Sequence, residues 1–215
     1  MNEKKTGILL DIDGTLWDSS TVVAESYQEM MDRHPEVGGA CTRDDIMHVM
    51  GKTMTEIEGI LFPQLAPEER HLFMKKCEDY EIEYLLTHPV EPFPGVVDTL
   101  RALSKDFPLF IVSNCQKGYI EAFIEITGLS DIILDHISFG DNLLPKGDNI
   151  RLIAERNGLE RYFYLGDIQS DYDATIAGGG EFIHAAYGFG TIRQSVPKIH
   201  DIRELPALMK ELAKS

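Results

Sequence analysis

The chain has 215 residues and a formal net charge of −16 at pH 7, with 36 acidic residues against 20 Lys and Arg. It is long enough for one domain with a sizeable core, or for one domain that carries an insertion. A nucleic-acid scaffold is disfavoured, because phosphate backbones are bound by surplus Lys and Arg. No apolar run approaches the ~18 residues of a membrane span, and the start "MNEKKTG" lacks a leader's apolar segment. We therefore expect a cytoplasmic protein with no membrane or nucleic-acid partner.

Short apolar runs alternate with helical patterns over most of the chain. The expected strands are 7–12, 108–113, 136–139, 162–167 and 181–187. The expected helices between and after them are 95–105, 117–127, 147–157, 170–177 and 203–213. Continuous aliphatic strands separated by helices are typical of an α/β fold, here a doubly wound parallel sheet covered on both faces. In such a sheet, ligands bind at the carboxyl ends of the strands.

One region, 19–92, interrupts this alternation. It contains no strand pattern, and its expected helices are 20–33, 43–50, 53–61 and 67–87. The exit "THPVEPFPG" carries three prolines, which stiffen a connection back to the sheet. The sequence therefore predicts a sheet domain made of 1–18 and 93–215, with a helical domain inserted after the first strand. Trp17, close to this junction, is expected to pack between the two.

The first strand ends in two carboxylates, Asp11 and Asp13, that are separated by one residue. In extended backbone these side chains point the same way, so they repel unless a cation lies beside them or one carries a proton. Gly14 permits a sharp turn, and Thr15 adds a hydroxyl. Taken alone, the stretch is also compatible with a polar turn that closes a strand.

Polar side chains also follow the other strands. Ser113 and Asn114 end the second strand, Lys146 stands at a helix entry, and Asp167 and Asp171 are four residues apart after the fourth strand. Each signal has a structural alternative, namely a helix N-cap, a solvated lysine, or an N-cap followed by a surface acid. Together they place an acid pair, a hydroxyl, a lysine and a second acid pair at successive strand ends, which favours a phosphate-handling site.

These four motifs, "DIDGTLWDS", "VSN", the isolated Lys146 and "GDIQSD", resemble those of the haloacid dehalogenase-like hydrolase superfamily. The resemblance spans the chain and is to the phosphoglycolate phosphatase-like subgroup, which has an α-helical cap of the C1 type. It implies a Rossmann-like core and an inserted cap, in agreement with the strandless segment. It also implies that Asp11 is a nucleophile that forms an aspartyl-phosphate, and that Asp13 is the general acid and base.

The resemblance further implies a cofactor and its ligands. Mg²⁺ would be held by Asp11, by the backbone carbonyl of Asp13 and by Asp167, with Asp171 holding the metal's waters. Ser113 and Lys146 would bind the phosphoryl oxygens. Thr15 and Asn114 are further substrate-binding candidates.

One departure from the family pattern, one residue that matches it and one loop bear on the function. Gly147 follows the motif lysine where many relatives have proline, so this loop is expected to differ. The presence of Asp13 favours phosphate esters over the carbon–halogen and carbon–phosphorus bonds that some relatives cleave. The stretch "HVMGKTMTEIEG" resembles the substrate-specificity loop of the cap, which makes Lys52 and Thr53 candidates to contact the leaving group. Lys52 would suit a second anionic group, such as that of phosphoglycolate, unless it is simply a surface lysine.

The expected function is that of a Mg²⁺-dependent phosphatase acting on a small phosphorylated metabolite, of phosphoglycolate, sugar phosphate or nucleotide type. A phosphomutase of the β-phosphoglucomutase type is the nearest alternative, since it would use the same two aspartates. A non-catalytic binding protein that kept the fold is a third. The sequence leaves the substrate open and is compatible with a monomer or a homodimer.

Overall fold

The computed structural model describes residues 5–214, so the first four residues of the predicted sheet domain and Ser215 lie outside it. Its centre is a six-stranded parallel sheet in the order β3-β2-β1-β4-β5-β6. The strands are β1 (Thr6–Leu10), β2 (Leu109–Ser113), β3 (Ile133–Ser138), β4 (Arg161–Gly166), β5 (Glu181–Ala185) and β6 (Lys198–Ile199). The first strand of the chain is thus central, and Leu9 lies opposite Phe110 on one side and Tyr164 on the other.

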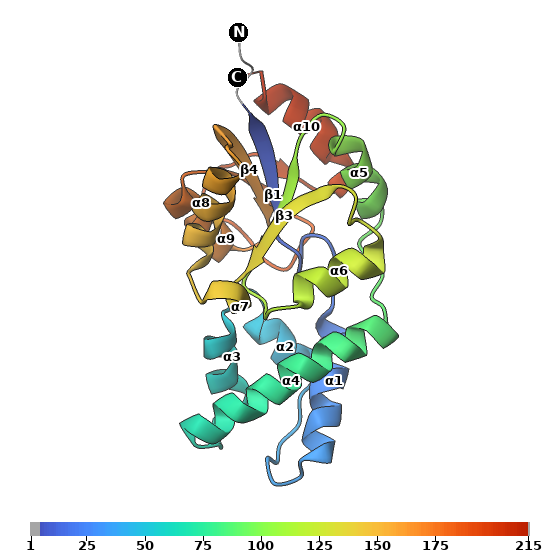
Figure 1. Cartoon of the computed structure of the whole chain (residues 1–215), viewed down its shortest axis with the longest axis vertical. Coiled ribbons are helices and arrows are strands. Elements are labelled where there is room, and N and C mark those ends of the chain that lie inside the picture. Colours follow the sequence, from blue (N-terminus) through green and yellow to red (C-terminus); the bar gives the residue numbers. More distant parts are fainter. Residues whose placement is uncertain (1–4, 215) are drawn as a thin grey trace.

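Helices cover both faces of the sheet (Figure 1). Side chains alternate along β1, so Ile8 and Leu10 pack in one hydrophobic cluster and Leu9 in another. The first cluster includes residues of α5 (Val96–Leu103), α6 (Tyr119–Thr127) and α10 (Leu205–Leu212). The second includes residues of α8 (Lys146–Arg156) and packs against α9 (Gln169–Gly178). Because β1 is buried on both faces, truncating Leu9 to alanine would cost about 2–5 kcal/mol of stability.

Four helices form a separate group at one end of the molecule, which we call the four-helix segment (20–87; Figure 1). They are α1 (Ser20–Arg33), α2 (Arg43–Val49), α3 (Met54–Leu61) and α4 (Pro67–Thr87). The segment has its own hydrophobic cluster, which includes Tyr27, Phe62 and Phe73. Its two connections to the sheet are tied together, since the backbone of Trp17 pairs with that of Pro92 and the amide of Phe93 donates to Leu16.

The strands observed in the sheet agree with those expected from the sequence, with two differences. The third strand begins at Ile133 and ends at Ser138, and a short helix α7 (Phe139–Asn142) follows it. This edge strand is half-exposed, so its polar residues Asp135 and His136 obscure the aliphatic pattern. The sixth strand was not predicted because two residues are too short to show a periodicity. A 3-10 turn, η1 (Ile202–Glu204), precedes the last helix.

None of the helices in 5–214 is long and apolar enough to cross a membrane. The thiols of Cys41, Cys77 and Cys115 are buried and free.

Candidate active site

The polar residues singled out in the sequence converge at the carboxyl ends of the strands. Asp11 directly follows β1, Ser113 ends β2, and Asp167 directly follows β4. Lys146 begins α8 and Asp171 lies in the first turn of α9. All five side chains are buried. Because β1 lies between β2 and β4, their polar ends face one point, as expected where ligands bind in open α/β sheets.

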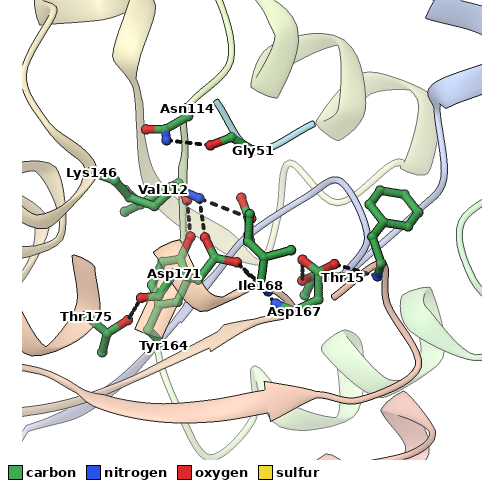
Figure 2. A network of polar contacts seen from close by, with 12 residues as sticks. Thr15, Gly51, Val112, Asn114, Lys146, Tyr164, Asp167, Ile168, Asp171 and Thr175 are labelled. Atoms are coloured by element: carbon green, nitrogen blue, oxygen red, sulfur yellow. Dashed lines mark hydrogen bonds and ion pairs between the residues drawn. The ribbon is translucent and has the colours of Figure 1, made fainter. Parts of the chain in front are cut away.

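Lys146 links two of the carboxylates (Figure 2). Its Nζ lies 3.1 Å from Asp11 Oδ2 and 2.7 Å from Asp171 Oδ1, and all three side chains are almost inaccessible to solvent. Burial disfavours the ammonium, but the attraction of Asp11 and Asp171 outweighs it and holds the pKa of Lys146 well above its ordinary value. Asp171 is held in turn, since its Oδ2 accepts the backbone amides of Asp167 and Ile168, each at 3.2 Å. Lys146 is therefore a fixed positive charge beside Asp11.

The same cluster fits a divalent cation. Oxygen atoms of Asp11, Asp167 and Asp171 lie within 4.8 Å of one another, and three carboxylates against one lysine leave a formal charge of −2. Asp11 Oδ1 is buried without a hydrogen-bond partner among the described residues, so it is available to a ligand. Burial, with smaller contributions from neighbouring acids, raises the pKa of Asp11 to about 7. A hard cation prefers such oxygen ligands and would relieve this repulsion.

Asp167 is oriented by groups on two loops. Its Oδ2 accepts the amide of Phe189 at 2.7 Å, and its Oδ1 accepts the hydroxyl of Thr15 at 3.4 Å (Figure 2). Burial, then the charges of Asp171 and Asp11, raise the pKa of Asp167 to about 8. Gly14 has φ of +77°, and a Cβ there would lie 2.2 Å from Asp167 Oδ2, so glycine is needed on both counts. Thr15, a predicted substrate-binding residue, is fully buried and its hydroxyl contacts Asp167.

Asp13 has a different environment from Asp11. Its Oδ1 accepts three hydrogen bonds, from Trp17 Nε1 at 2.9 Å, Ser19 Oγ at 2.7 Å and the Tyr119 hydroxyl at 2.7 Å. These donors fix the carboxyl group through one oxygen and leave Oδ2 outside their network. Burial nevertheless raises the pKa of Asp13, against the lowering effect of the three donors. A carboxyl group that is fixed through one oxygen and has a raised pKa is suited to proton transfer.

A cavity of about 60 Å³ lies between the sheet and the four-helix segment. Asp11, Asp13, Ser113 and Asn114 line it from the sheet side, and Lys52 lines it from the four-helix segment. The predicted catalytic residues Asp11, Asp13 and Ser113 therefore share one cavity, and Lys146 contacts Asp11 at its edge.

The loop between α2 and α3 meets the sheet domain at Asn114. The Asn114 side chain donates to the backbone carbonyl of Gly51 at 2.9 Å (Figure 2). Gly51 has φ of +78°, and a Cβ there would lie 2.2 Å from Ile168 Cδ1. Asn114 thus contacts the four-helix segment while lining the cavity. The hydroxyl of Thr53 bonds to Glu56 and caps α3, and Thr53 lines a neighbouring hollow beside Lys146.

Gly147, the departure noted after the motif lysine, has a packing role. A Cβ at this position would lie 3.0 Å from the Ala174 carbonyl and 3.3 Å from the Ala177 Cβ. Across this contact a Cβ on Gly178 would lie 2.8 Å from the Gly147 carbonyl. Two facing glycines thus let α8 and α9 approach closely, which positions Lys146 and Asp171 at their adjoining N-termini.

Several site residues were not found from the sequence. Trp17 was expected to pack, and it does so edge-on against Tyr119 and Phe123, but its indole N–H also bonds to Asp13. Ser19, Tyr119 and the buried Glu81 carried no sequence signal, because nothing in their local pattern indicates a residue far away in the chain.

Comparisons with known proteins agree with this geometry. The model of the haloacid dehalogenase-like hydrolase family matches residues 8–185. Phosphoglycolate phosphatase of Aquifex aeolicus (strain VF5) is 26% identical over 199 residues, which cover 88% of this chain and 89% of that protein. Pyrophosphatase PpaX of Listeria monocytogenes serotype 4a (strain HCC23) is 27% identical over 185 residues, which cover 81% and 80%.

Solved structures share the fold. The haloacid dehalogenase-like family hydrolase SP0104 of Streptococcus pneumoniae has a TM-score of 0.78 at 19% identity and covers 97% of this chain and 100% of its own. A predicted phosphoglycolate phosphatase from Haemophilus somnus 129pt has a TM-score of 0.80 at 19% identity, with coverage of 97% and 99%. The family model, which covers most of the chain, together with the four strand-end motifs, identifies this chain as a member of the haloacid dehalogenase-like hydrolase family.

Proposed function

We propose that this protein is a Mg²⁺-dependent phosphatase that hydrolyses the phosphomonoester of a small metabolite through an aspartyl-phosphate on Asp11. The observation that carries this proposal is the state of the Asp11 carboxylate. It is buried, one oxygen is paired with Lys146, and the other has no partner among the described residues. The names of the relatives, phosphoglycolate phosphatase and pyrophosphatase, also support phosphoryl chemistry.

Each residue of the site has a separate role in this reaction. The Asp11 carboxylate attacks phosphorus, the bond from phosphorus to the leaving oxygen breaks, and Asp13 gives that oxygen its proton. In the second half, Asp13 takes a proton from water, whose oxygen attacks phosphorus and releases Asp11. Lys146 and Ser113 hold the phosphoryl oxygens, and the charge of Lys146 lets one anion approach another.

The acidic cluster would provide the ligands for a metal ion. Asp11, Asp167 and the backbone carbonyl of Asp13 would hold Mg²⁺, with Asp171 contacting its waters. When bound, the ion supplies positive charge that offsets the charge developing on the phosphoryl group. The Thr15 hydroxyl and the Phe189 amide orient Asp167, and the charge of the cation would favour the ionised form that burial and the neighbouring acids disfavour.

We further propose that residues 19–92 act as a cap over the site. The support is the contact of Asn114 with Gly51 and the cavity enclosed between the sheet and the four-helix segment. A cap that closes excludes water and shapes the space for the leaving group. The substrate would then be chosen by side chains of the four-helix segment.

The test is release of inorganic phosphate from a panel of phosphorylated metabolites, with and without Mg²⁺. Asp11→Asn should lower kcat by at least about 10³-fold, because an amide is a poor nucleophile. The matched control is Asp98→Asn, the same change at an exposed position of α5, and it should leave kcat unaltered. Phosphate release that persists in Asp11→Asn would contradict the proposal. An isomerised sugar phosphate without phosphate release would instead indicate a phosphomutase.

A further inference from the structure

Glu81 is a buried acid that the proposed reaction does not use. It lies on α4 in the four-helix segment, is 3% exposed, and lines the same cavity as Asp11 and Asp13. Within the described part of the chain, no Lys or Arg nitrogen lies within 4.0 Å of its carboxyl group. Buried carboxyl groups are costly unless they have a partner, so this one calls for an explanation.

The groups that face Glu81 are neutral or acidic. The Tyr27 hydroxyl and the Gln116 amide adjoin its carboxyl, while Asp13 and Glu78 act on it as like charges. Gln116 is itself 3% exposed and lines the cavity, and its Nε2 has no hydrogen-bond partner among the described residues. The cavity lining therefore presents an acceptor, Glu81 of α4, beside an unsatisfied donor, Gln116 of the loop that follows β2.

Most of the remaining lining that the four-helix segment contributes is apolar, namely Val23, Ile46, Val49, Met50, Met54 and Ile57. Lys52 is the basic residue that this segment contributes, and its charge acts on Glu56 of α3, whose pKa is lowered chiefly by hydrogen bonds to Thr53. The four-helix side of the cavity is therefore mainly apolar.

Glu81 and Gln116 would form different hydrogen bonds with each class of leaving group. A carboxylate or second phosphate carries a full charge that this mainly apolar lining would strip of water, and it has no hydrogen to donate to Glu81. An ammonium group only donates, and would leave Gln116 Nε2 unsatisfied. A hydroxyl donates to Glu81 and accepts from Gln116 at the same time.

We infer that Glu81 and Gln116 together recognise a hydroxyl group of the leaving alcohol, and that the substrates are phosphomonoesters of uncharged, hydroxylated compounds of the polyol or sugar class. This inference rests on the proposed function, because the leaving alcohol is the part that departs from phosphorus beside Asp13. It makes Glu81 a specificity-determining residue, and it excludes a second anionic group of the kind that Lys52 would have favoured.

The test uses substrates that differ at a single group. They are 2-hydroxyethyl phosphate, ethyl phosphate, 2-aminoethyl phosphate and phosphoglycolate, together with glycerol 3-phosphate and 3-phosphoglycerate as a longer pair. We expect wild-type kcat/KM to be at least about tenfold higher for the hydroxyl compound of each set, because a polar site rejects analogues that leave its groups unpaired. These ratios are measured on the wild-type protein, so they test the inference even if a substitution at position 81 prevents folding.

Variants then assign the preference to its residues. Glu81→Leu should lower the ratio of 2-hydroxyethyl to ethyl phosphate about tenfold, while Glu81→Gln, which keeps an acceptor oxygen, should retain most of that ratio. Glu83→Leu, on the exposed face of the same helix, is the matched control and should change neither ratio.

The outcomes separate the two proposals. Asp11-dependent release that favours phosphoglycolate, or ratios that Glu81→Leu leaves intact, would overturn this inference while the phosphatase stands. Absence of release from every compound of the wider panel, in folded protein with Mg²⁺, would overturn the proposed function and this inference with it.

Discussion

Removing the carboxyl group of Glu81 should change how the stability of the protein depends on pH. Burial raises the pKa of Glu81 from 4.5 to about 8, against the lowering effect of the Gln116 amide and the Tyr27 hydroxyl. The folded protein therefore keeps a proton on Glu81 between these two pH values, whereas the unfolded chain releases it. The contribution of Glu81 to the free energy of unfolding is fully present below pH 4.5 and is lost as the pH rises to about 8.

The size of this effect follows from the two pKa values. One pKa unit corresponds to about 1.4 kcal/mol, so the interval from 4.5 to about 8 amounts to about 5 kcal/mol at most, and about 3–5 kcal/mol is expected. Glu81→Gln keeps the shape of the side chain and cannot ionise. The free energy of unfolding of the variant minus that of wild type should be about 3–5 kcal/mol larger at pH 9 than at pH 5.

The assay is urea unfolding of wild type and Glu81→Gln at pH 5, 7 and 9, at constant ionic strength and saturating Mg²⁺. The other buried acids are common to both proteins, so the difference between the two isolates Glu81. Glu83→Gln, at an exposed position of the same helix, should show no pH-dependent difference from wild type. If the stabilities of wild type and Glu81→Gln run parallel from pH 5 to pH 9, the burial argument for Glu81 is wrong.

Three further predictions concern other parts of the site. Trp17→Phe removes one of three donors to the catalytic acid while keeping an aromatic ring, so steady-state kinetics should show kcat lowered about tenfold with little change in KM. An unaltered kcat would mean that the other two donors suffice. Gly51→Ala places a Cβ 2.2 Å from Ile168 Cδ1 and should lower kcat/KM at least about fivefold. The control is Gly38→Ala, because Gly38 also has a positive φ but a Cβ there would have no neighbour within 4 Å. Equal effects of these two substitutions would refute a role for the contact. Asp167→Asn should weaken Mg²⁺ binding at least about tenfold in calorimetry, and unchanged affinity would place the metal elsewhere.

The sequence was sufficient for the architecture and for the first group of site residues. The alternation of aliphatic strands with helices predicted the parallel sheet, because both faces of such a sheet are buried and its strands become continuous apolar runs. It was also enough to assign Asp11, Ser113, Lys146 and Asp167 to a single site, because parallel strands bring their carboxyl ends to one edge. Strand ends are local features, so they can be found by reading along the chain.

Only the tertiary structure decided how these groups are paired and what lies opposite them. Tyr119 donates to Asp13 across 106 residues, and Glu81 of α4 adjoins Gln116 of the loop that follows β2. The contact between the Thr15 hydroxyl and Asp167 shows the same limit, since it joins residues that are 152 positions apart. A cavity wall is assembled from side chains distant in sequence, each of which has an ordinary local pattern. The reaction class was therefore accessible from short motifs, whereas the choice of substrate depends on packing between the sheet and the four-helix segment.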